Sequence, residues 1–411
     1  MDTMFKWNRF DLPIKMLFLK YYAQSINSNF GDDIYKEHLR LWNGFREYDN
    51  PNKNSYDAFK SDFISMYNDV ADDKFDWSKS PVVIDNDGYL LNGAHRTAIA
   101  TYLNKAYKYK SPTGNRDGQK VCDYNMFTRL GLDEKYMDAA ALEIVRNNPN
   151  LLLVNLFPAA KHSRDLVDNI IQKYGNIFYK KNIHLNSLGS FNYMLQLYKG
   201  ESWAGDWNNN FAGYREKQNL CFEDSSGYMT AYLIDTENAT MLKEDIRSLY
   251  NIGNHSVHIN DTHEETLRLS RCLFNKNSIH FLNNCQIKNY QKFLSQLSYF
   301  ENFIIENELE EENYCITASS ILSAYGLREG SDLDYLHFSN DTIDGHSDIH
   351  SHNKYGIDRY TVHRDDIIFN PDNHFYYGNI KFASLNVVNE LKKKRAEQKD
   401  FVDMQLIEGV L

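Results

Sequence analysis

Four residues within five positions could bind an anion: Asn92, Gly93, His95 and Arg96. They lie where a helix is predicted to begin, and a helix start presents unpaired N–H groups and the positive end of its dipole. Gly93 allows a ligand to approach the backbone, while His95 and Arg96 add positively charged donors. The group predicts a pocket for a nucleotide polyphosphate. Taken singly, the same residues also fit a helix cap, a satisfied polar side chain and a surface ion-pair partner.

A second group consists of two serines and two alternating aspartates: Ser319, Ser320, Asp332 and Asp334. Residues two apart in a strand point to the same face, about 7 Å from each other, so the two carboxylates can share a divalent ion. Serines in a turn before a short helix can hold triphosphate oxygens. The group predicts a metal and phosphate site, unless the aspartates are ordinary acids at a strand edge.

The third group lies in the middle of the chain, at His258, Asp261 and His263. A histidine can take the proton of a sugar hydroxyl while a carboxylate orients its ring. The group therefore predicts a general base. Asp261 and Glu264 also fit a capping box, which requires no catalytic role.

Two further stretches are candidate binding segments. Trp203 and Trp207 stand among acids and glycines, which suits sugar stacking if the rings are exposed and core packing if they are buried. The loop 344–352 contains histidines and aspartates that could bind a metal, or it is a polar loop without a ligand.

Alternating helix and strand patterns must position these residues. Strands are expected at 81–84, 89–91, 151–157, 228–234, 256–259, 315–318, 332–338 and 366–369, with a hairpin turn at Asn86, Asp87 and Gly88. Helices are expected from a cap at Asp11, at 94–103, 164–174, 241–250, 287–307, 320–327 and 381–398, and from about 261. The pattern predicts a mixed α+β protein with domains at 1–135, 136–285 and 286–411.

Composition narrows the classes of function. The 411 residues carry a net charge of -11, which disfavours a bulk interaction with nucleic acid or an anionic membrane. No apolar run approaches the roughly 18 residues of a membrane span, and the first residues lack the pattern of a signal peptide. The five cysteines contain no Cys-x-x-Cys pair, which favours buried reduced thiols. These features predict a cytoplasmic protein without a transmembrane segment.

Residues 75–110 resemble the nucleotide site of the ParB and sulfiredoxin-like superfamily in the order strand, turn, strand, Gly-x-His-Arg and helix. The resemblance implies that Gly93, His95 and Arg96 bind phosphate. Sulfiredoxins carry a nucleophilic cysteine immediately before the His-Arg pair, whereas this chain has Ala94, which excludes that chemistry. A ParB-like DNA clamp would need a basic helix-turn-helix region after the motif, and none is recognised.

Residues 285–405 resemble the polymerase-beta-like nucleotidyltransferase superfamily, whose signature is a Gly-Ser turn, a helix and Asp-x-Asp. Ala318 takes the place of the first glycine. The resemblance implies Mg²⁺ bound by Asp332, Asp334 and a third carboxylate. Asp366 is the candidate for that third position, with Asp348 in reserve.

The order of the motifs along the chain resembles bacterial capsular polysaccharide transferases that attach O-methyl phosphoramidate to sugars. The resemblance rests on residues 49–51, 75–77, 92–96, 258–261 and 325–328. It implies a cytidine-nucleotide donor, a saccharide acceptor and phosphoryl-type transfer. Donor phosphates are then expected at the 92–96 motif, and His258 or His263 is the expected base.

Two alternatives remain open from the sequence. The first is a Mg²⁺-dependent nucleotidyltransferase that uses Asp332, Asp334 and Asp366. The second is a regulator that binds a nucleotide without turnover.

Overall fold

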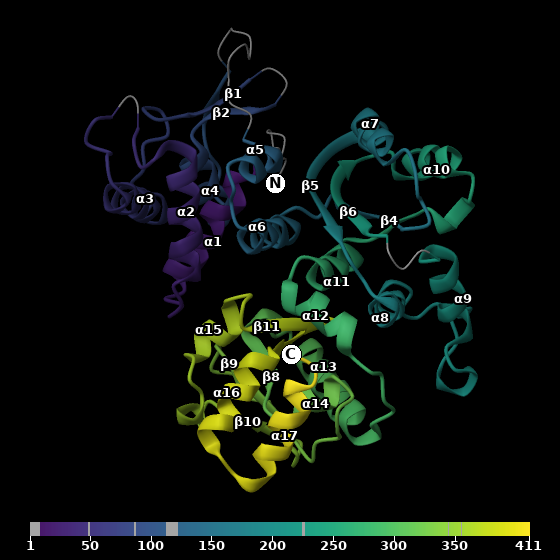
Figure 1. The fold of residues 1–411 in the computed structure, drawn as a ribbon. Helices are drawn as coiled ribbons and strands as arrows, with labels where there is room; N and C mark the ends of the chain where they lie inside the picture. The colour runs from purple at the N-terminus through teal and green to yellow at the C-terminus, as the bar shows by residue number, and fades with distance from the viewer. Residues whose placement is uncertain are drawn as a thin grey trace. The chain divides into compact units, whose positions relative to one another are not determined.

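A small sheet lies at one end of a group of helices in the first of two compact units, Met1–Asn148 and Pro149–Leu411 (Figure 1). The computed structural model describes residues 9–47, 50–85, 88–111, 122–223, 227–343, 345–354 and 356–411. The first unit contains α1 (Asp11–Ala23), α2 (Phe30–Asn43), α3 (Tyr56–Ala71), β1 (Val82–Ile84), β2 (Leu90–Asn92), α4 (Ala94–Tyr102), β3 (Tyr109–Lys110), α5 (Tyr124–Arg129) and α6 (Glu134–Asn147).

The core of the first unit places α4 beside its sheet. Strand order is β2-β1-β3, with β2 antiparallel and β3 parallel to β1. Phe18, Tyr35, Phe63 and Ile99, from α1, α2, α3 and α4, pack in one apolar cluster. This cluster fixes the start of α4 against the three N-terminal helices.

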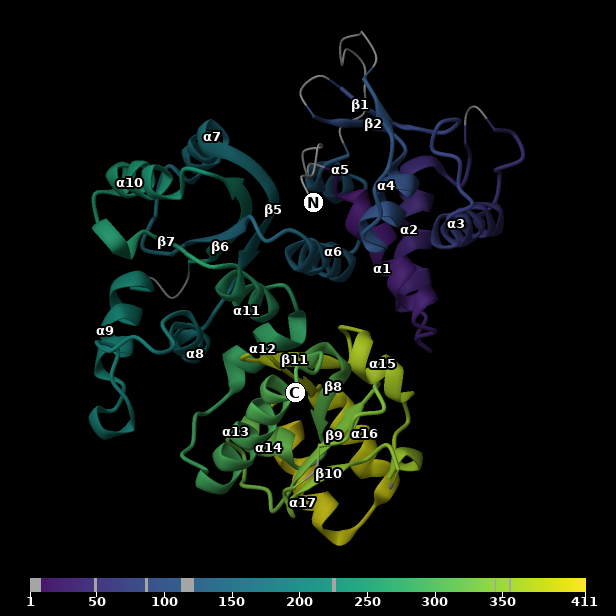
Figure 2. The ribbon, with the colours of Figure 1, turned by 180° about the vertical axis from the view of Figure 1, so that it is seen from behind.

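The second unit begins with an antiparallel sheet of order β5-β6-β4-β7. Its elements are β4 (Leu151–Leu156), α7 (Arg164–Tyr174), β5 (Gly175–Ile183), α8 (Ser187–Leu197), α9 (Ala212–Cys221), β6 (Met229–Thr236), α10 (Ala239–Tyr250), β7 (Val257–Ile259), α11 (His263–Leu273) and α12 (Lys276–Asn284). Side chains of α7 and α10 cover one face of this sheet, and α8 and α11 lie against the other (Figure 2).

The rest of the second unit is built on a mixed sheet of order β10-β9-β8-β12-β11. Its elements are α13 (Gln291–Glu306), β8 (Tyr314–Thr317), α14 (Ser320–Ala324), β9 (Leu333–His337), β10 (Ile349–Ser351), α15 (Arg364–Phe369), β11 (His374–Tyr377), β12 (Ile380–Ala383), α16 (Leu385–Arg395) and α17 (Gln398–Glu408). Helices α11 and α12 connect the two sheets, because α11 contacts both β4 and β11.

The predicted α+β class is confirmed, but three local predictions are wrong. Residues 364–369 form α15 and not a strand, because the His363 side chain caps the first turn and acids follow it. The predicted helix at 381–398 is β12 followed by α16 and α17, since Ser384 caps α16 and Ala396 turns left-handed after it. Asp11 lies inside α1 and is not its cap.

No described helix has both the length and the apolar character required to cross a membrane. The turn residues Asn86 and Asp87 lie outside the described part of the chain, as do Asp49 and Asp344.

Candidate functional site

Gly93 joins β2 to α4 and provides the backbone of the first candidate site. Its φ of 100° lies in the left-handed region, which glycine adopts readily. Strand β2 pairs with β1 through Asn92 opposite Val83, so the hairpin brings the chain directly to the helix start. Helix α4 has no side-chain cap at its first turn. The alternative interpretation, in which the Asn92 side chain only caps α4, is therefore wrong.

Arg96 holds this turn together. Its Nη1 donates to Ser80 Oγ and to the carbonyl oxygen of Pro81, each at 2.8 Å, and its Nη2 donates to Asn92 Oδ1 at 2.9 Å. These partners are neutral, so Arg96 keeps its charge near the helix start while it ties the hairpin to α4. Asn92 is exposed and acts here as an acceptor for Arg96.

His95 differs from the sequence prediction, which gave it a positive charge. Burial lowers its pKa well below the usual value, and Lys15 and Lys53 lower it further. Its Nε2 lies 2.9 Å from the hydroxyl of Tyr35, and its ring meets Phe63 edge-on at 4.6 Å. His95 is therefore a neutral hydrogen-bonding group at physiological pH.

A cavity of about 440 Å³ opens at the start of α4, and we call it the α4 pocket. Four cationic and two acidic side chains line it, together with Asn92, Gly93, Ala94, His95 and other residues. The cations are Arg9, Lys15, Lys53 and Arg96, and the acids are Asp11 and Glu47. Arg9 and Lys15 pair with Asp11, and Lys53 pairs with Glu47 and with Asp62 at 2.7 Å, so four cations meet three acids. The remaining excess of positive charge at a helix start suits an anion.

Lys15 and Lys53 were missed by the sequence analysis because neither lies near the motif in the chain. Lys15 is 3% exposed, with its ammonium 2.7 Å from Asp11 and 3.3 Å from His38 Nε2. Asp11 and Lys15, two opposite charges four positions apart within an apolar stretch of α1, were the available signal.

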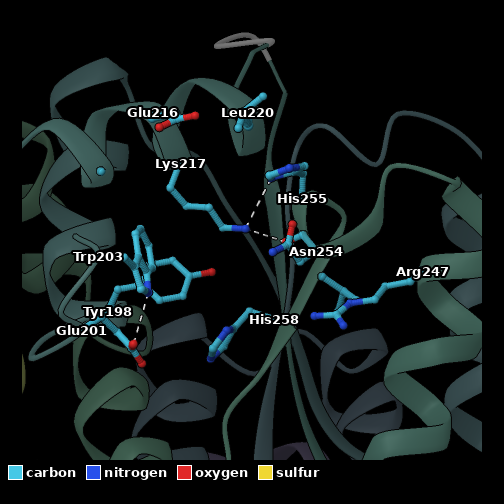
Figure 3. A pocket seen from close by; sticks show the side chains of 12 residues that line it. Tyr198, Glu201, Trp203, Glu216, Lys217, Leu220, Arg247, Asn254, His255 and His258 are labelled. Atoms are coloured by element: carbon cyan, nitrogen blue, oxygen red, sulfur yellow. Dashed lines mark hydrogen bonds between the residues drawn. The ribbon is translucent and has the colours of Figure 1, made fainter.

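The second candidate site is a cavity of about 520 Å³, here called the His258 pocket (Figure 3). It lies beside β7, where His258 pairs with Asn155 of β4. Its lining includes Tyr198, Glu201, Trp203, Lys217 and Arg247, with Gly213, Glu216, Leu220, Asn254, His255 and Val257.

His258 is neutral and has a buried ring nitrogen at this pocket. Burial lowers its pKa to about 4, with a further contribution from Lys243. Its Nε2 is buried without a hydrogen-bond partner among the described residues. A buried ring nitrogen with no partner is costly unless a ligand satisfies it.

Asp261 and His263 do not line the His258 pocket. The Asp261 side chain is 83% exposed and lies 3.7 Å from Lys243. The capping box predicted at Asp261 and Glu264 does not form: Thr262 caps α11 by accepting from Glu265 N, and the Glu265 carboxylate accepts from Asp261 N at 3.1 Å. His263 is the first residue of α11.

The third candidate site is the turn between β8 and α14. Ala318 has a φ of 54°, so an alanine holds the left-handed conformation at the position of the superfamily's glycine. Ser319 precedes α14 and its Oγ lies 3.4 Å from Arg328 Nη2. The buried Ser320 hydroxyl lies 3.3 Å from both Asp332 O and Asp334 N, so it braces the turn.

The predicted metal ligands are dispersed among other partners. Asp334 lies on β9 with its carboxylate 3.2 Å from His352 Nε2, and Asp332 immediately precedes the strand. Asp366 lies on α15 and accepts from Asn370 and Asn373 at 3.2 and 3.1 Å. Asp348 pairs with Lys292 at 2.9 Å.

Within the described ranges, no three His, Cys, Asp or Glu side chains are grouped so that they could hold a metal ion. Asp332, Asp334 and Asp366 are therefore not gathered as three ligands, nor are the described side chains of the loop 344–352, and Mg²⁺ binding by the aspartates stays a prediction.

Comparison with known proteins found no family model, no curated protein and no solved structure that matches this chain.

Proposed function

We propose that this chain is a transferase that moves a phosphorus-containing group, of the O-methyl phosphoramidate kind, from a cytidine nucleotide to a sugar hydroxyl. The observation that carries the proposal is the α4 pocket, where Lys15, Lys53 and Arg96 meet the uncapped start of a helix. Such a site suits donor phosphates. The cytidine preference and the saccharide acceptor rest on the resemblance of the sequence motifs.

His258 is the base in this proposal. The sugar hydroxyl gives its proton to Nε2 of His258 while its oxygen forms a bond to phosphorus. The bond from phosphorus to the leaving phosphate oxygen breaks, and its electron pair departs with the nucleotide. The α4 pocket belongs to the first unit and the His258 pocket to the second.

Thermal unfolding of the full chain with CTP, CDP, CMP, ATP, GTP and UTP, each with and without Mg²⁺, tests donor binding. We expect cytidine nucleotides to raise the melting temperature, and Lys53→Met to abolish the increase. Lys60→Met is the matched control, because Lys60 also pairs with an aspartate in the first unit but lies outside the pocket. An increase that survives Lys53→Met, or no increase with any nucleotide, would contradict the proposal.

Nucleotidyl transfer is the second candidate, favoured by the left-handed Ala318 at the β8–α14 turn. It predicts a Mg²⁺-dependent increase that Asp332→Ala removes and Lys53→Met leaves intact. A nucleotide-binding regulator would show the increase in melting temperature and no release of product.

A further inference from the structure

Trp203 presents an exposed, oriented ring at the His258 pocket. Trp203 is 47% exposed, and its Nε1 donates a hydrogen bond to Glu201 Oε2 at 3.1 Å, which fixes the orientation of the ring. The ring also meets Tyr198 edge-on, with 5.1 Å between centroids. A large aromatic ring that is held in place but left uncovered is suited to stacking against a ligand.

The loop that carries Trp203 is fixed by close approach to α9. A Cβ atom on Gly213 would lie 2.3 Å from the carbonyl oxygen of Trp203, so glycine is required for this contact. Ala204, next to Trp203, is fully buried and its carbonyl accepts from Tyr214 N. The aromatic wall of the pocket is therefore preformed.

Two cations reach the same pocket. Lys217 is 7% exposed, with its ammonium 2.8 Å from the carbonyl oxygen of Asn254 and 5.8 Å from the centre of the Tyr198 ring, and burial lowers its pKa. Arg247 has its Nε buried with no hydrogen-bond partner within the described chain. Figure 3 shows Lys217, Arg247 and His258 turned toward a common space beside Tyr198, whose ring meets His258 edge-on at 5.3 Å.

The acids of the pocket leave these cations available. Glu201 accepts the hydrogen bond of Trp203, and Figure 3 places Glu216 away from Lys217 Nζ and Arg247. A neutral hydroxyl could accept a hydrogen bond from Arg247, but it would leave the charges of Lys217 and Arg247 uncompensated. A carboxylate or a phosphate would satisfy both cations.

We propose that the His258 pocket binds a sugar that carries a carboxylate or a phosphate, with its ring on Trp203 and its anionic group between Lys217 and Arg247. The identification of this ligand as the acceptor, an acidic sugar or a sugar phosphate, rests on the proposed function. The binding site itself does not, because it lies wholly in the second unit and needs no nucleotide.

Saturation-transfer NMR with the full chain tests the proposal on three probes: methyl glucoside, methyl glucuronide and glucose 1-phosphate. We expect at least one charged sugar to bind ten times more tightly than the neutral glucoside. The stronger of the two charged probes then identifies carboxylate or phosphate as the preferred group. Equal binding of all three, or no binding, would overturn the proposal.

Substitutions test which side chains contact the sugar ring and its anionic group. Trp203→Ala should reduce affinity for the charged sugar at least fivefold, whereas Trp207→Ala, which removes a similarly exposed tryptophan outside the pocket, should not. Arg247→Met should remove the preference for charge and Arg247→Lys should retain part of it, which separates loss of charge from loss of folding. Equal affinity of Trp203→Ala and Trp207→Ala would overturn the stacking role.

Inorganic phosphate and CMP complete the test. If either binds to this pocket as tightly as the charged sugar, the site recognises an anion or a nucleotide and the proposal is wrong. Sugar binding without any nucleotide effect on melting temperature would contradict the donor site alone. Nucleotide binding without sugar binding would contradict only the present inference.

Discussion

At the scale of single residues, burial decides the charge of the two histidines at the candidate sites and thereby their chemistry. His258 and His95 both have pKa values lowered by burial, so both are neutral at physiological pH. A neutral ring can accept a proton or a hydrogen bond, but it cannot neutralise phosphate. This favours His258 as a base. The negative charge of a bound phosphate would then be neutralised by Lys15, Lys53 and Arg96.

The lowered pKa of His258 predicts a pH-dependent stability. The unfolded chain binds a proton at this ring near pH 6.5 and the folded chain near pH 4, so the unfolded state holds more protons between these values. The free energy of unfolding should therefore fall as the pH is lowered through this window, by at most about 3 kcal/mol from this group.

Urea unfolding of the native chain and of His258→Gln, at pH 7 and pH 4.5, measures this contribution. Because glutamine does not titrate, the variant should lose less stability over that interval. An identical loss in both proteins would show that His258 is accessible to protons in the folded state.

Residue types were predictable where a motif is continuous in sequence. Gly93 does occupy a left-handed turn at a helix start, and His258 does lie on a strand beside a cavity. Lys217 and Arg247 were not predictable, because they reach the His258 pocket from α9 and α10 and no local pattern distinguishes them from surface cations.

At the scale of elements, a buried charge network joins α16 and α17. Lys392 is fully buried, with its ammonium 2.5 Å from Asp403 Oδ2 and 3.6 Å from Asp400 Oδ1. Arg328, which follows α14, donates to both oxygens of Asp403 at 2.5 and 2.6 Å. The two C-terminal helices are thus fixed to the β8–α14 region through a single aspartate.

Asp403→Ala should destabilise the chain by about 3 kcal/mol, because it removes one partner of a buried lysine and of Arg328. Glu390→Ala is the control, since Glu390 pairs with Lys393 on the exposed surface of α16. This substitution should change stability by less than about 0.5 kcal/mol. Urea unfolding measures both variants, and equal values would mean that the network contributes no net stability.

Elements were predictable where hydrophobic periodicity and caps agree. The strands near 151–157 and 228–234 and the helix at 164–174 lie where the pattern put them. The run Ile367, Ile368 and Phe369 looked like a buried strand, but the cap at His363 and the acids after it start a helix that buries the same residues. Short apolar runs do not distinguish the two structures.

At the scale of the whole molecule, all five cysteines are free and buried; Cys122 lies in the first unit and the other four lie in the second. Burial raises the pKa of Cys221, Cys272, Cys285 and Cys315 to about 12. Since the thiolate is the reactive form, we expect no thiol to react with a maleimide at pH 7 in the folded chain and all five to react in urea. Rapid modification of a native thiol would contradict this burial.

If the five native thiols do not react in the folded chain, a cysteine introduced at the surface can be labelled with a dye without replacing any native cysteine. A cysteine introduced at Lys79, on the first unit, and another at Ile305, on the second, would each replace a well-exposed side chain. A dye pair at these two positions would report the separation of the units by energy transfer. Recording it while a nucleotide and a charged sugar are added in turn would show directly whether substrates draw the two pockets together.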